Sequence, residues 1–203
     1  MKADTEDKKT ALYQAARELF ASKGFKDTSV ADITGKAGYS VGTFYNYYAS
    51  KDRLFTEIME RETGEMMRGV LKTLDLNDDP VRLIKRLLAL NMEGMLANPI
   101  LRQWYDPEVS GKIERLFRED DGLSAMNFLY RDFHKLVQQW QREGKIRADI
   151  DSEMIMALFG AIIRIGYHKE EIGLNYFPAL QDYLTDFVLS GLTDRAAEKG
   201  ANI

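Results

Sequence analysis

Residues 28–47 read TSVADITGKAGYSVGTFYNY, and this stretch decides how the N-terminal part of the chain folds. Ser29 can cap a helix, and Asp32, three residues later, completes a variant of the capping box. Gly38 is suited to end that helix in a left-handed conformation. Ser40 can then cap a second helix. The stretch therefore predicts two short helices separated by a tight turn that contains glycine.

A longer helix precedes this pair and provides a surface for it. Apolar side chains recur at helical spacings of three and four before Gly24, which is placed to end the helix. These side chains are Leu12, Ala15, Ala16, Leu19 and Phe20. Three helices in this order are typical of a helix-turn-helix, whose second short helix enters the major groove of DNA. That helix is expected over about residues 41–47, with Phe44 facing inward.

The distribution of charge in this region suits contact with DNA. The whole chain has a net charge of −4, but residues 1–53 contain nine Lys and Arg against seven Asp and Glu. No acidic residue lies between Asp32 and Asp52. A carboxylate on this surface would repel the phosphate backbone, so its absence favours nucleic-acid binding. In so short a stretch, chance is the alternative explanation.

Helical patterns continue to the end of the 203 residues and predict an all-α fold. We expect an N-terminal three-helix helix-turn-helix DNA-binding domain over residues 1–49. A six-helix C-terminal body for ligand binding and dimerisation is expected over residues 50–203. Its helices begin after Ser50 and then cover about residues 80–96, 122–143, 151–171 and 177–195, with short helical pieces over residues 98–119.

The composition excludes several classes of protein. The chain has no cysteine, and its two histidines are His134 and His168, which leaves almost no material for thiol, histidine or metal catalysis. No catalytic residue, metal site, cofactor or enzymatic activity is expected. The longest apolar run, residues 154–163, has ten residues, whereas a membrane helix needs about 20. Since no secretory signal is evident either, we expect a soluble, cytoplasmic protein that does not enter membranes.

Residues 12–55 resemble the N-terminal signature of TetR-family transcriptional regulators. The resemblance rests on Thr28–Ile33, Ala37-Gly38, Ser40–Tyr48 and Ser50–Phe55. It implies an all-α homodimer that binds a palindromic operator on double-stranded DNA. It also implies a small-molecule effector in the C-terminal body that releases the DNA.

Nine residues are candidates for contact with DNA. The resemblance places residues at the start of the second helix against phosphates. It places residues of the recognition helix against phosphates or bases, and the lysine at the start of the following helix against a phosphate. Gly42 would let the recognition helix approach the DNA backbone closely. Tyr39 and Tyr48, which depart from the family pattern, are expected to pack inward. The candidate residues are Thr28, Ser29, Ser40, Gly42, Thr43, Tyr45, Asn46, Tyr47 and Lys51.

A pocket for a mainly hydrophobic effector is expected inside the body. Six of the nine methionines lie between residues 59 and 126, and flexible methionine side chains suit a wall that accepts ligands of varied shape. The alternative is that these methionines and aromatic residues simply form a core. The candidate lining residues are Met59, Met66, Leu87, Asn91, Met95, Trp104, Tyr105, Phe117, Met126, Tyr130, Phe133 and His134.

The last two helices are expected to form a homodimer interface. The helix over about residues 151–171 is apolar around most of its circumference, and a partner could cover the side that its own body does not. The helix over about residues 177–195 has one long apolar stripe; the alternative is that both helices close the monomer core. The stripe consists of Leu180, Tyr183, Leu184, Phe187, Val188 and Leu192.

Two other classes of function remain open at the level of sequence. A helical carrier of hydrophobic ligands without DNA binding would explain the apolar body, but not the acid-free, tyrosine-rich turn. A helical adaptor for protein interactions would need a long exposed apolar stripe on the N-terminal domain, where the sequence shows none. Binding to DNA would distinguish a regulator from both.

Overall fold

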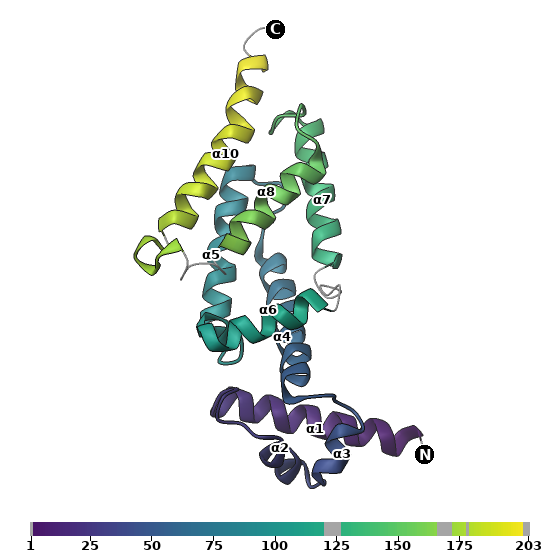
Figure 1. Ribbon diagram of the computed structural model, residues 1–203. Helices are drawn as coiled ribbons and strands as arrows, with labels where there is room; N and C mark the ends of the chain where they lie inside the picture. The colour runs from purple at the N-terminus through teal and green to yellow at the C-terminus, as the bar shows by residue number, and fades with distance from the viewer. Residues whose placement is uncertain (1, 120–126, 166–171, 178, 201–203) are drawn as a thin grey trace. The chain divides into compact units, whose positions relative to one another are not determined.

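The computed structural model describes residues 2–119, 127–165, 172–177 and 179–200 (Figure 1). Over these residues the chain is helical and contains no β-strand, as the sequence predicted. Two compact units are present. The first consists of Met1–Lys72 and Leu90–Ala125, and the second of Thr73–Ala89 and Met126–Ile203.

The first unit contains the three predicted helices of the helix-turn-helix, which are α1 (Lys2–Ser22), α2 (Val30–Ala37) and α3 (Val41–Tyr45). α2 packs against both α1 and α3. The unit continues through nearly all of α4 (Lys51–Thr73) and the later part of α5 (Pro80–Ala97). It ends with the 3-10 helix η1 (Leu101–Tyr105) and with α6 (Pro107–Glu119).

The predicted helix caps of the two short helices are present. Ser29 and Asp32 form the capping box of α2, and Gly38 ends that helix with a left-handed φ of 77°. Ser40 caps α3 by accepting the backbone N–H of Thr43 at 3.3 Å. α3 ends at Tyr45 and is shorter than the predicted helix over residues 41–47. The reason is a tightened last turn, in which backbone N–H groups bond to carbonyls three residues back.

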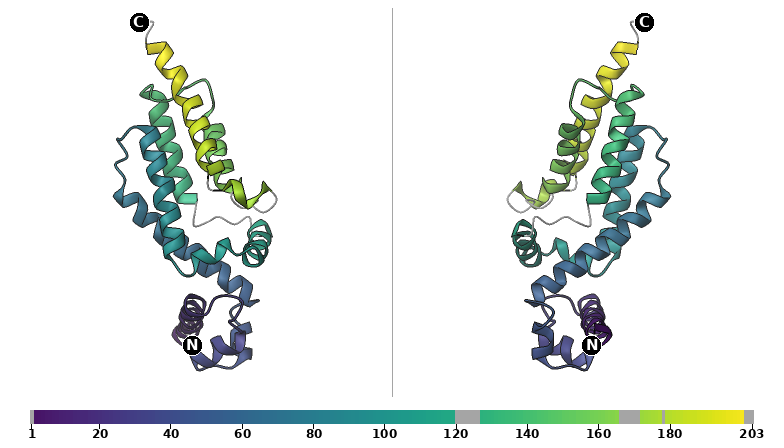
Figure 2. Two further views of the ribbon diagram at one scale, coloured as in Figure 1. Left: turned by 90° about the vertical axis from the view of Figure 1, so that its left-hand side faces the viewer. Right: turned by 90° about the vertical axis from the view of Figure 1, so that its right-hand side faces the viewer.

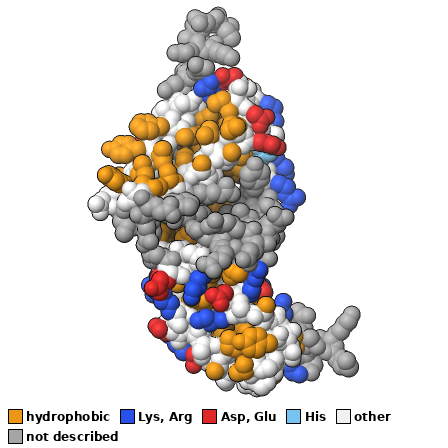
Figure 3. All heavy atoms as spheres, in the orientation of Figure 1, with side chains coloured by type: hydrophobic (Ala, Val, Ile, Leu, Met, Phe, Trp, Pro, Cys, Tyr) orange, Lys and Arg blue, Asp and Glu red, His pale blue; other side chains and the backbone are white. Residues whose placement is uncertain are grey.

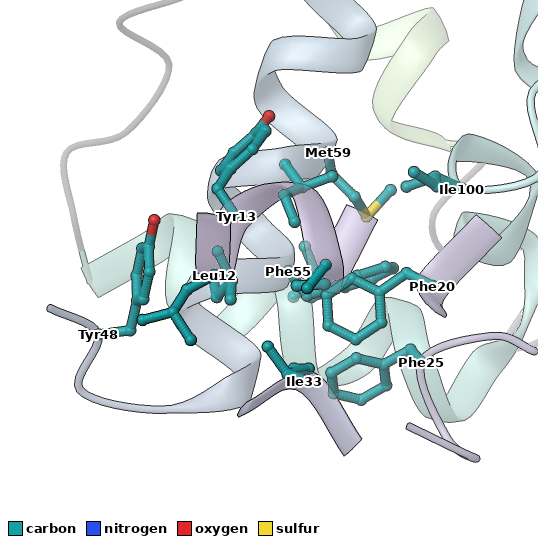
Figure 4. Close-up of a cluster of buried hydrophobic side chains, with 14 of the residues drawn as sticks. Leu12, Tyr13, Phe20, Phe25, Ile33, Tyr48, Phe55, Met59 and Ile100 are labelled. Atoms are coloured by element: carbon teal, nitrogen blue, oxygen red, sulfur yellow. The ribbon is translucent and has the colours of Figure 1, made fainter. Parts of the chain in front are cut away.

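Aromatic side chains form the centre of the core of the first unit (Figure 4). The Phe55 ring lies 4.9 Å from the Phe20 ring and 4.7 Å from the Phe25 ring, measured between centroids. Phe44 is fully buried, as predicted. The same core includes α4 side chains and, further along the chain, residues such as Ile100 and Val109. The helix-turn-helix therefore shares its core with residues beyond the predicted boundary at residue 49.

The second unit consists of the first part of α5 followed by α7 (Asn127–Arg142), α8 (Ser152–Ile165), the 3-10 helix η3 (Leu174–Tyr176) and α10 (Ala179–Gly200). α8 packs against both α7 and α10 and lies between them in the view of Figure 1, and Figure 2 shows these helices from two other sides. Trp140, Val137, Ile155 and Leu189 are buried together in its core. Gly144 follows α7 with a left-handed φ of 68°, which confirms the predicted end of that helix.

The last helices differ from their predicted bounds at some ends. Residues 122–126 and 166–171, predicted to be helical, lie outside the described residues. α10 begins at Ala179 instead of residue 177, and it continues to Gly200, past the predicted end near residue 195. Alanine, glutamate and lysine, which favour helix, dominate that extension.

In the part of the chain that the structure describes, no helix combines the length and the apolar character required to cross a membrane. The same residues contain no group of three or more His, Cys, Asp or Glu side chains placed to hold a metal ion.

Candidate DNA-binding interface

α3 exposes a face that is partly apolar and partly polar. Val41 and Tyr45 have exposed fractions of 44% and 57%, and their spacing of four residues places them on one side of the helix. Asn46, the C-cap residue, is also exposed. The Tyr45 ring meets the buried Phe44 ring edge-on, with centroids 5.3 Å apart. The buried phenylalanine thus anchors a helix whose opposite side is open.

The other tyrosines near the turn pack against the protein. Tyr39 and Tyr47 are half-buried against the core of the first unit. Tyr48 is 5% exposed and lies beside Phe44, at one edge of the core cluster (Figure 4). Burial raises the pKa of its hydroxyl. The expectation that Tyr39 and Tyr48 pack inward is therefore confirmed.

Gly42 is exposed on α3, and the fold itself does not require a glycine there. A Cβ atom added to Gly42 would meet only the Ser40 hydroxyl, at an ordinary contact distance of 3.8 Å. Glycine in a helix costs about 0.5–1 kcal/mol relative to alanine. Since packing gives no reason for this cost, the absence of a side chain points to close approach by something outside the chain.

The start of α2 is capped by its own acidic residue. The Asp32 carboxylate accepts hydrogen bonds from the backbone N–H and the hydroxyl of Ser29, at 2.8 and 2.7 Å. It also pairs with the Lys23 ammonium at 3.0 Å. The Ser29 hydrogen bonds and the Lys23 ammonium hold the pKa of Asp32 well below its usual range. The N-terminus of α2 is therefore capped by a carboxylate of the helix itself.

Thr28 is buried beneath this helix start. Its side chain is 1% exposed, and its hydroxyl donates a hydrogen bond to the carbonyl oxygen of Gly24 at 2.7 Å. This hydrogen bond fixes the connection between α1 and α2. For Thr28 the structure shows a positioning role, and contact with DNA stays a prediction.

Lys51, at the first residue of α4, is also directed inward. Its ammonium donates to the carbonyl oxygens of Phe25 and Thr28, both at 2.7 Å, and lies 4.2 Å from the centroid of the Phe25 ring. Burial lowers the pKa of the ammonium. Lys51 thus ties α4 to the α1–α2 connection, and its predicted contact with phosphate stays a prediction.

Several other lysines of the unit pair with carboxylates. Lys36 contacts Glu18 at 2.9 Å, and Lys26 contacts both Asp106 and Glu108, at 2.9 and 2.7 Å. These pairs reduce the positive potential around α2. Much of the cationic charge that the sequence places near the turn is therefore matched within the unit.

Gln103 of η1 is an important residue that the sequence analysis missed. Its amide oxygen accepts the backbone N–H of Phe25 at 2.7 Å, and its amide nitrogen donates to the carbonyls of Phe20 and Pro99, both at 2.9 Å. One side chain therefore joins the end of α1, the α1–α2 connection and the segment before η1. A single glutamine carries no sequence pattern that would have indicated this.

A buried carboxylate forms a second connection that the sequence analysis missed. Glu62 of α4 is 6% exposed, pairs with the Arg17 guanidinium of α1, and accepts a hydrogen bond from the Asn98 amide at 2.7 Å. Two surface grooves, of about 410 and 280 Å³, lie beside Arg17 and Glu62. Neither groove is lined by any of the predicted effector-binding residues.

The predicted effector-binding residues are distributed over both units. In the first unit Met59 is buried, while Met66, Met95 and Trp104 are half-buried against the same core. The Met66 side chain covers Gly94, where an added Cβ would come within 2.5 Å of the methionine sulfur. Asn91 and Tyr105 also belong to the first unit, and Leu87 belongs to the second.

The remaining predicted lining residues belong to α6, α7 and the segment between them. Phe133 packs edge-on against Phe159, with centroids 5.7 Å apart, and the His134 Nε2 atom lies 2.7 Å from the Ser152 hydroxyl. Met126 lies outside the described residues, as do the side chains of Phe117 and Tyr130. Their role in ligand binding stays a prediction.

The predicted apolar stripe on α10 divides into a buried part and an exposed part. Leu192 is buried in the core of the second unit, whereas Tyr183 and Phe187 have exposed fractions of 62% and 70%. Their two rings stack, with centroids 6.3 Å apart. Met154 of α8 is 56% exposed as well. In Figure 3 hydrophobic side chains gather over the part of the surface where α8 and α10 lie in Figure 1. Such a patch is typical of an interaction surface.

Comparison with known sequences decides the family. The sequence profile described as "Bacterial regulatory proteins, tetR family" matches residues 12–58. The HTH-type transcriptional regulator YdgC of Bacillus subtilis (strain 168) is 36% identical over 205 residues, which cover 97% of this chain and 89% of YdgC. The chain belongs to the TetR family.

Other TetR-family relatives cover most of this chain. The HTH-type transcriptional repressor DhaR of Mycobacterium sp. (strain GP1) is 24% identical over 172 residues, which cover 82% of this chain and 86% of DhaR. The family consists of transcriptional regulators, not enzymes, and its members bind DNA and small-molecule effectors and act as dimers.

Solved structures show the same fold. RolR in complex with resorcinol has a TM-score of 0.68 and 19% identity, and the match covers 98% of this chain and 93% of RolR. FadR of Thermus thermophilus in complex with lauroyl-CoA has a TM-score of 0.61 and 21% identity, with 90% and 94% covered. At these identities the similarity concerns the fold alone.

The inward position of Lys51 predicts a structural role in this TetR-family domain. Lys51→Ala would leave two part-buried carbonyl oxygens without their donor and should lower the free energy of unfolding by about 1–3 kcal/mol. Lys36→Ala is the matched control, because Lys36 pairs with an exposed carboxylate and such pairs contribute about 1 kcal/mol or less. Urea unfolding measures both, and equal losses for the two variants would contradict the assigned role.

Proposed function

We propose that this protein is a ligand-responsive repressor that binds a palindromic operator as a homodimer. The observation that carries the proposal is the open face of α3 in a TetR-family helix-turn-helix. There Gly42, a glycine that packing does not require, lies between the exposed Val41 and Tyr45. Its relative DhaR is named as a repressor, which supports the same role here. Such a regulator acts where the chromosome lies, which in a bacterium is the cytoplasm.

In the proposed complex, α3 of each protomer enters the major groove. Two-fold symmetry would place the two recognition helices about one DNA turn, or 34 Å, apart. The residues proposed to contact DNA directly are Ser40, Gly42, Thr43, Tyr45, Asn46 and Tyr47. Thr28, Ser29 and Lys51 would act mainly by holding the start of α2, and therefore the angle at which α3 is presented.

The homodimer is proposed to form through α8 and α10. Tyr183 and Phe187 supply stacked aromatic area at low conformational cost, since each ring is already held by its neighbour. Met154, which is 56% exposed, supplies apolar surface on α8. Aromatic anchors of this kind dominate the energetics of protein interfaces.

The effector is proposed to be a small, mainly apolar molecule bound in the C-terminal body. The methionine-rich and aromatic composition of residues 59–134 supports this chemistry. The structural neighbours RolR and FadR were solved with resorcinol and lauroyl-CoA, an aromatic and a fatty-acyl ligand.

Ligand binding is proposed to reach the DNA through α4 and η1. Lys51 joins the start of α4 to the α1–α2 connection, and Met59 and Met66 lie on later turns of the same helix. The candidate ligand residues Trp104 and Tyr105 follow directly after Gln103, which holds that same connection. A shift of either element would tilt α2 and change the spacing of the two recognition helices.

Gly42→Ala should change stability and DNA affinity in opposite directions. Alanine is the better helix former, so the variant should be more stable by about 0.5–1 kcal/mol, yet its methyl group would obstruct the approach of DNA. The full chain is incubated with fragmented genomic DNA, and the fragments that it retains are sequenced. The affinity of the wild type and of the variant for these fragments is then measured by gel shift. The wild type is expected to retain a few fragments with two-fold symmetry, and Gly42→Ala to bind them more weakly.

Gly69→Ala is the matched control for this experiment. Gly69 is an exposed helical glycine of α4 whose added Cβ would meet no atom within 4 Å, and it lies outside the helix-turn-helix. It should gain similar stability and keep full affinity for the fragments. A wild-type chain that retains no specific fragment while still binding apolar ligands would instead be a carrier, which contradicts the proposed function.

Phe187→Glu should convert the dimer into monomers. A buried charge in the middle of the apolar patch would have no partner, so association should fail. Sedimentation at micromolar concentration should show twice the chain mass of 23.3 kDa for the wild type and the chain mass for the variant. Leu76→Glu, an equal change at a residue 48% exposed in the α4–α5 connection, should remain dimeric. A monomeric wild type would contradict the proposed interface.

An apolar ligand should stabilise the protein and release it from DNA. Lauroyl-CoA, lauric acid and resorcinol serve as probes, with coenzyme A and glycerol as polar controls. An effector present at 100 times its Kd should stabilise the fold by about 2.7 kcal/mol, which thermal unfolding detects readily. The same compound should dissociate the retained DNA fragments in the gel shift. If only the polar compounds act, the apolar effector class is wrong.

A further inference from the structure

The recognition helix contains no positively charged side chain that could donate hydrogen bonds to DNA bases. α3 consists of Val41–Tyr45, and residues 37–50 contain no charged residue at all. In the major groove, guanine is read most often by arginine or lysine, which donate two hydrogen bonds to its O6 and N7 atoms. The residues of α3 cannot provide this contact.

The neighbouring cations do not replace it. No arginine lies between Arg17 and Arg53. Lys36 pairs with Glu18 at 2.9 Å, and Lys51 donates to two backbone carbonyls at 2.7 Å. Lys51 is therefore held within the protein, and Lys36, whose pair with Glu18 is exposed, lies on α2 and not on the recognition helix.

The exposed groups on α3 suit a different set of base edges. Val41 presents two methyl groups and Tyr45 presents an aromatic ring, with exposed fractions of 44% and 57%. The C5-methyl group of thymine is the apolar group that standard bases offer in the major groove. The exposed Asn46 has an amide that can donate to N7 and accept from N6–H of adenine. Gly42 lets the helix approach closely enough for such short side chains to reach.

We infer that α3 reads A·T base pairs, with Val41 and Tyr45 packed against thymine methyl groups and Asn46 hydrogen-bonded to adenine. This inference rests on the proposed function, in which α3 is the recognition helix. It adds the class of base sequence that the helix selects. The base pairs beneath α3 in each half-site are therefore A·T, and guanine contributes little to recognition there.

The first test is selection of binding sites from random double-stranded DNA by the full chain. Enriched half-sites should contain A·T pairs at the positions that α3 covers, which hydroxyl-radical footprinting locates. Enriched half-sites with G·C pairs at those positions would overturn the inference and leave the proposed function standing. No enrichment of any sequence would overturn the proposed function, and this inference with it.

The second test removes single methyl groups from the selected site. Deoxyuridine replaces each thymidine in turn and keeps every hydrogen bond while deleting the C5-methyl. Loss of one buried methyl contact should weaken binding about fourfold at the positions that Val41 and Tyr45 touch. Unchanged affinity at every thymidine would overturn the inference.

Protein variants assign the contacts to residues. Val41→Ser should abolish the difference between thymidine and deoxyuridine at one position, and Tyr45→Ser at another. Tyr45→Phe is the matched control, because it keeps the ring and should keep the methyl dependence. Asn46→Ala should lose its preference for adenine at one position. Val41, Tyr45 and Asn46 are exposed, so circular dichroism is expected to show folded variants, although Tyr45→Ser also loses its ring contact with Phe44. Methyl dependence that persists in the serine variants would overturn the assignment.

Discussion

The short connection between α1 and α2 is the constraint on which the DNA-binding unit depends. After Gly24 the chain leaves α1 with a left-handed φ of 86°, and its next backbone groups need partners away from any helix. Lys51 donates to two of its carbonyls, Gln103 accepts one of its N–H groups, and Thr28 closes it onto Gly24. The Phe25 side chain lies beneath, against the rings of the core. Because α2 begins directly after this connection, its direction is set by residues from α4 and η1.

This arrangement has an electrostatic consequence. Lys51 and Lys26 take part in holding the connection, and Lys23 supports the cap of α2 through Asp32. These lysine ammonium groups could otherwise contact phosphate, but here they partly stabilise the fold of the domain. Neutral donors and close contact must then supply more of the affinity, and these depend on shape. In the proposed complex, the fit of α3 into the groove is therefore more important than long-range attraction, and the absence of a side chain at Gly42 favours that fit.

Much of the first unit could be predicted from its sequence because its determinants are local. A capping box, a left-handed glycine and an apolar spacing are each defined within a few residues, and Ser29, Gly38 and Leu12 behave as their patterns indicated. The end of α3 was predicted less well, because a tightened last turn depends on the chain that follows. Gln103 and Glu62 could not be predicted, since their partners lie 78 and 45 residues away in the sequence.

The candidate site shows the same difference between local and distant information. The exposure of Tyr45 and Asn46 followed from helical periodicity, whereas Tyr47, which was expected to reach the DNA as well, is half-buried against the core. The inward position of Thr28 and Lys51 did not follow, because a threonine or lysine near a helix start is equally compatible with contact to a phosphate or to a backbone carbonyl. Only the tertiary structure shows that Lys51 donates to carbonyls of the α1–α2 connection, while its contact with a phosphate on DNA stays a prediction. The two acceptors are chemically similar, and a residue that positions the recognition helix can therefore have the same sequence signature as one that touches DNA.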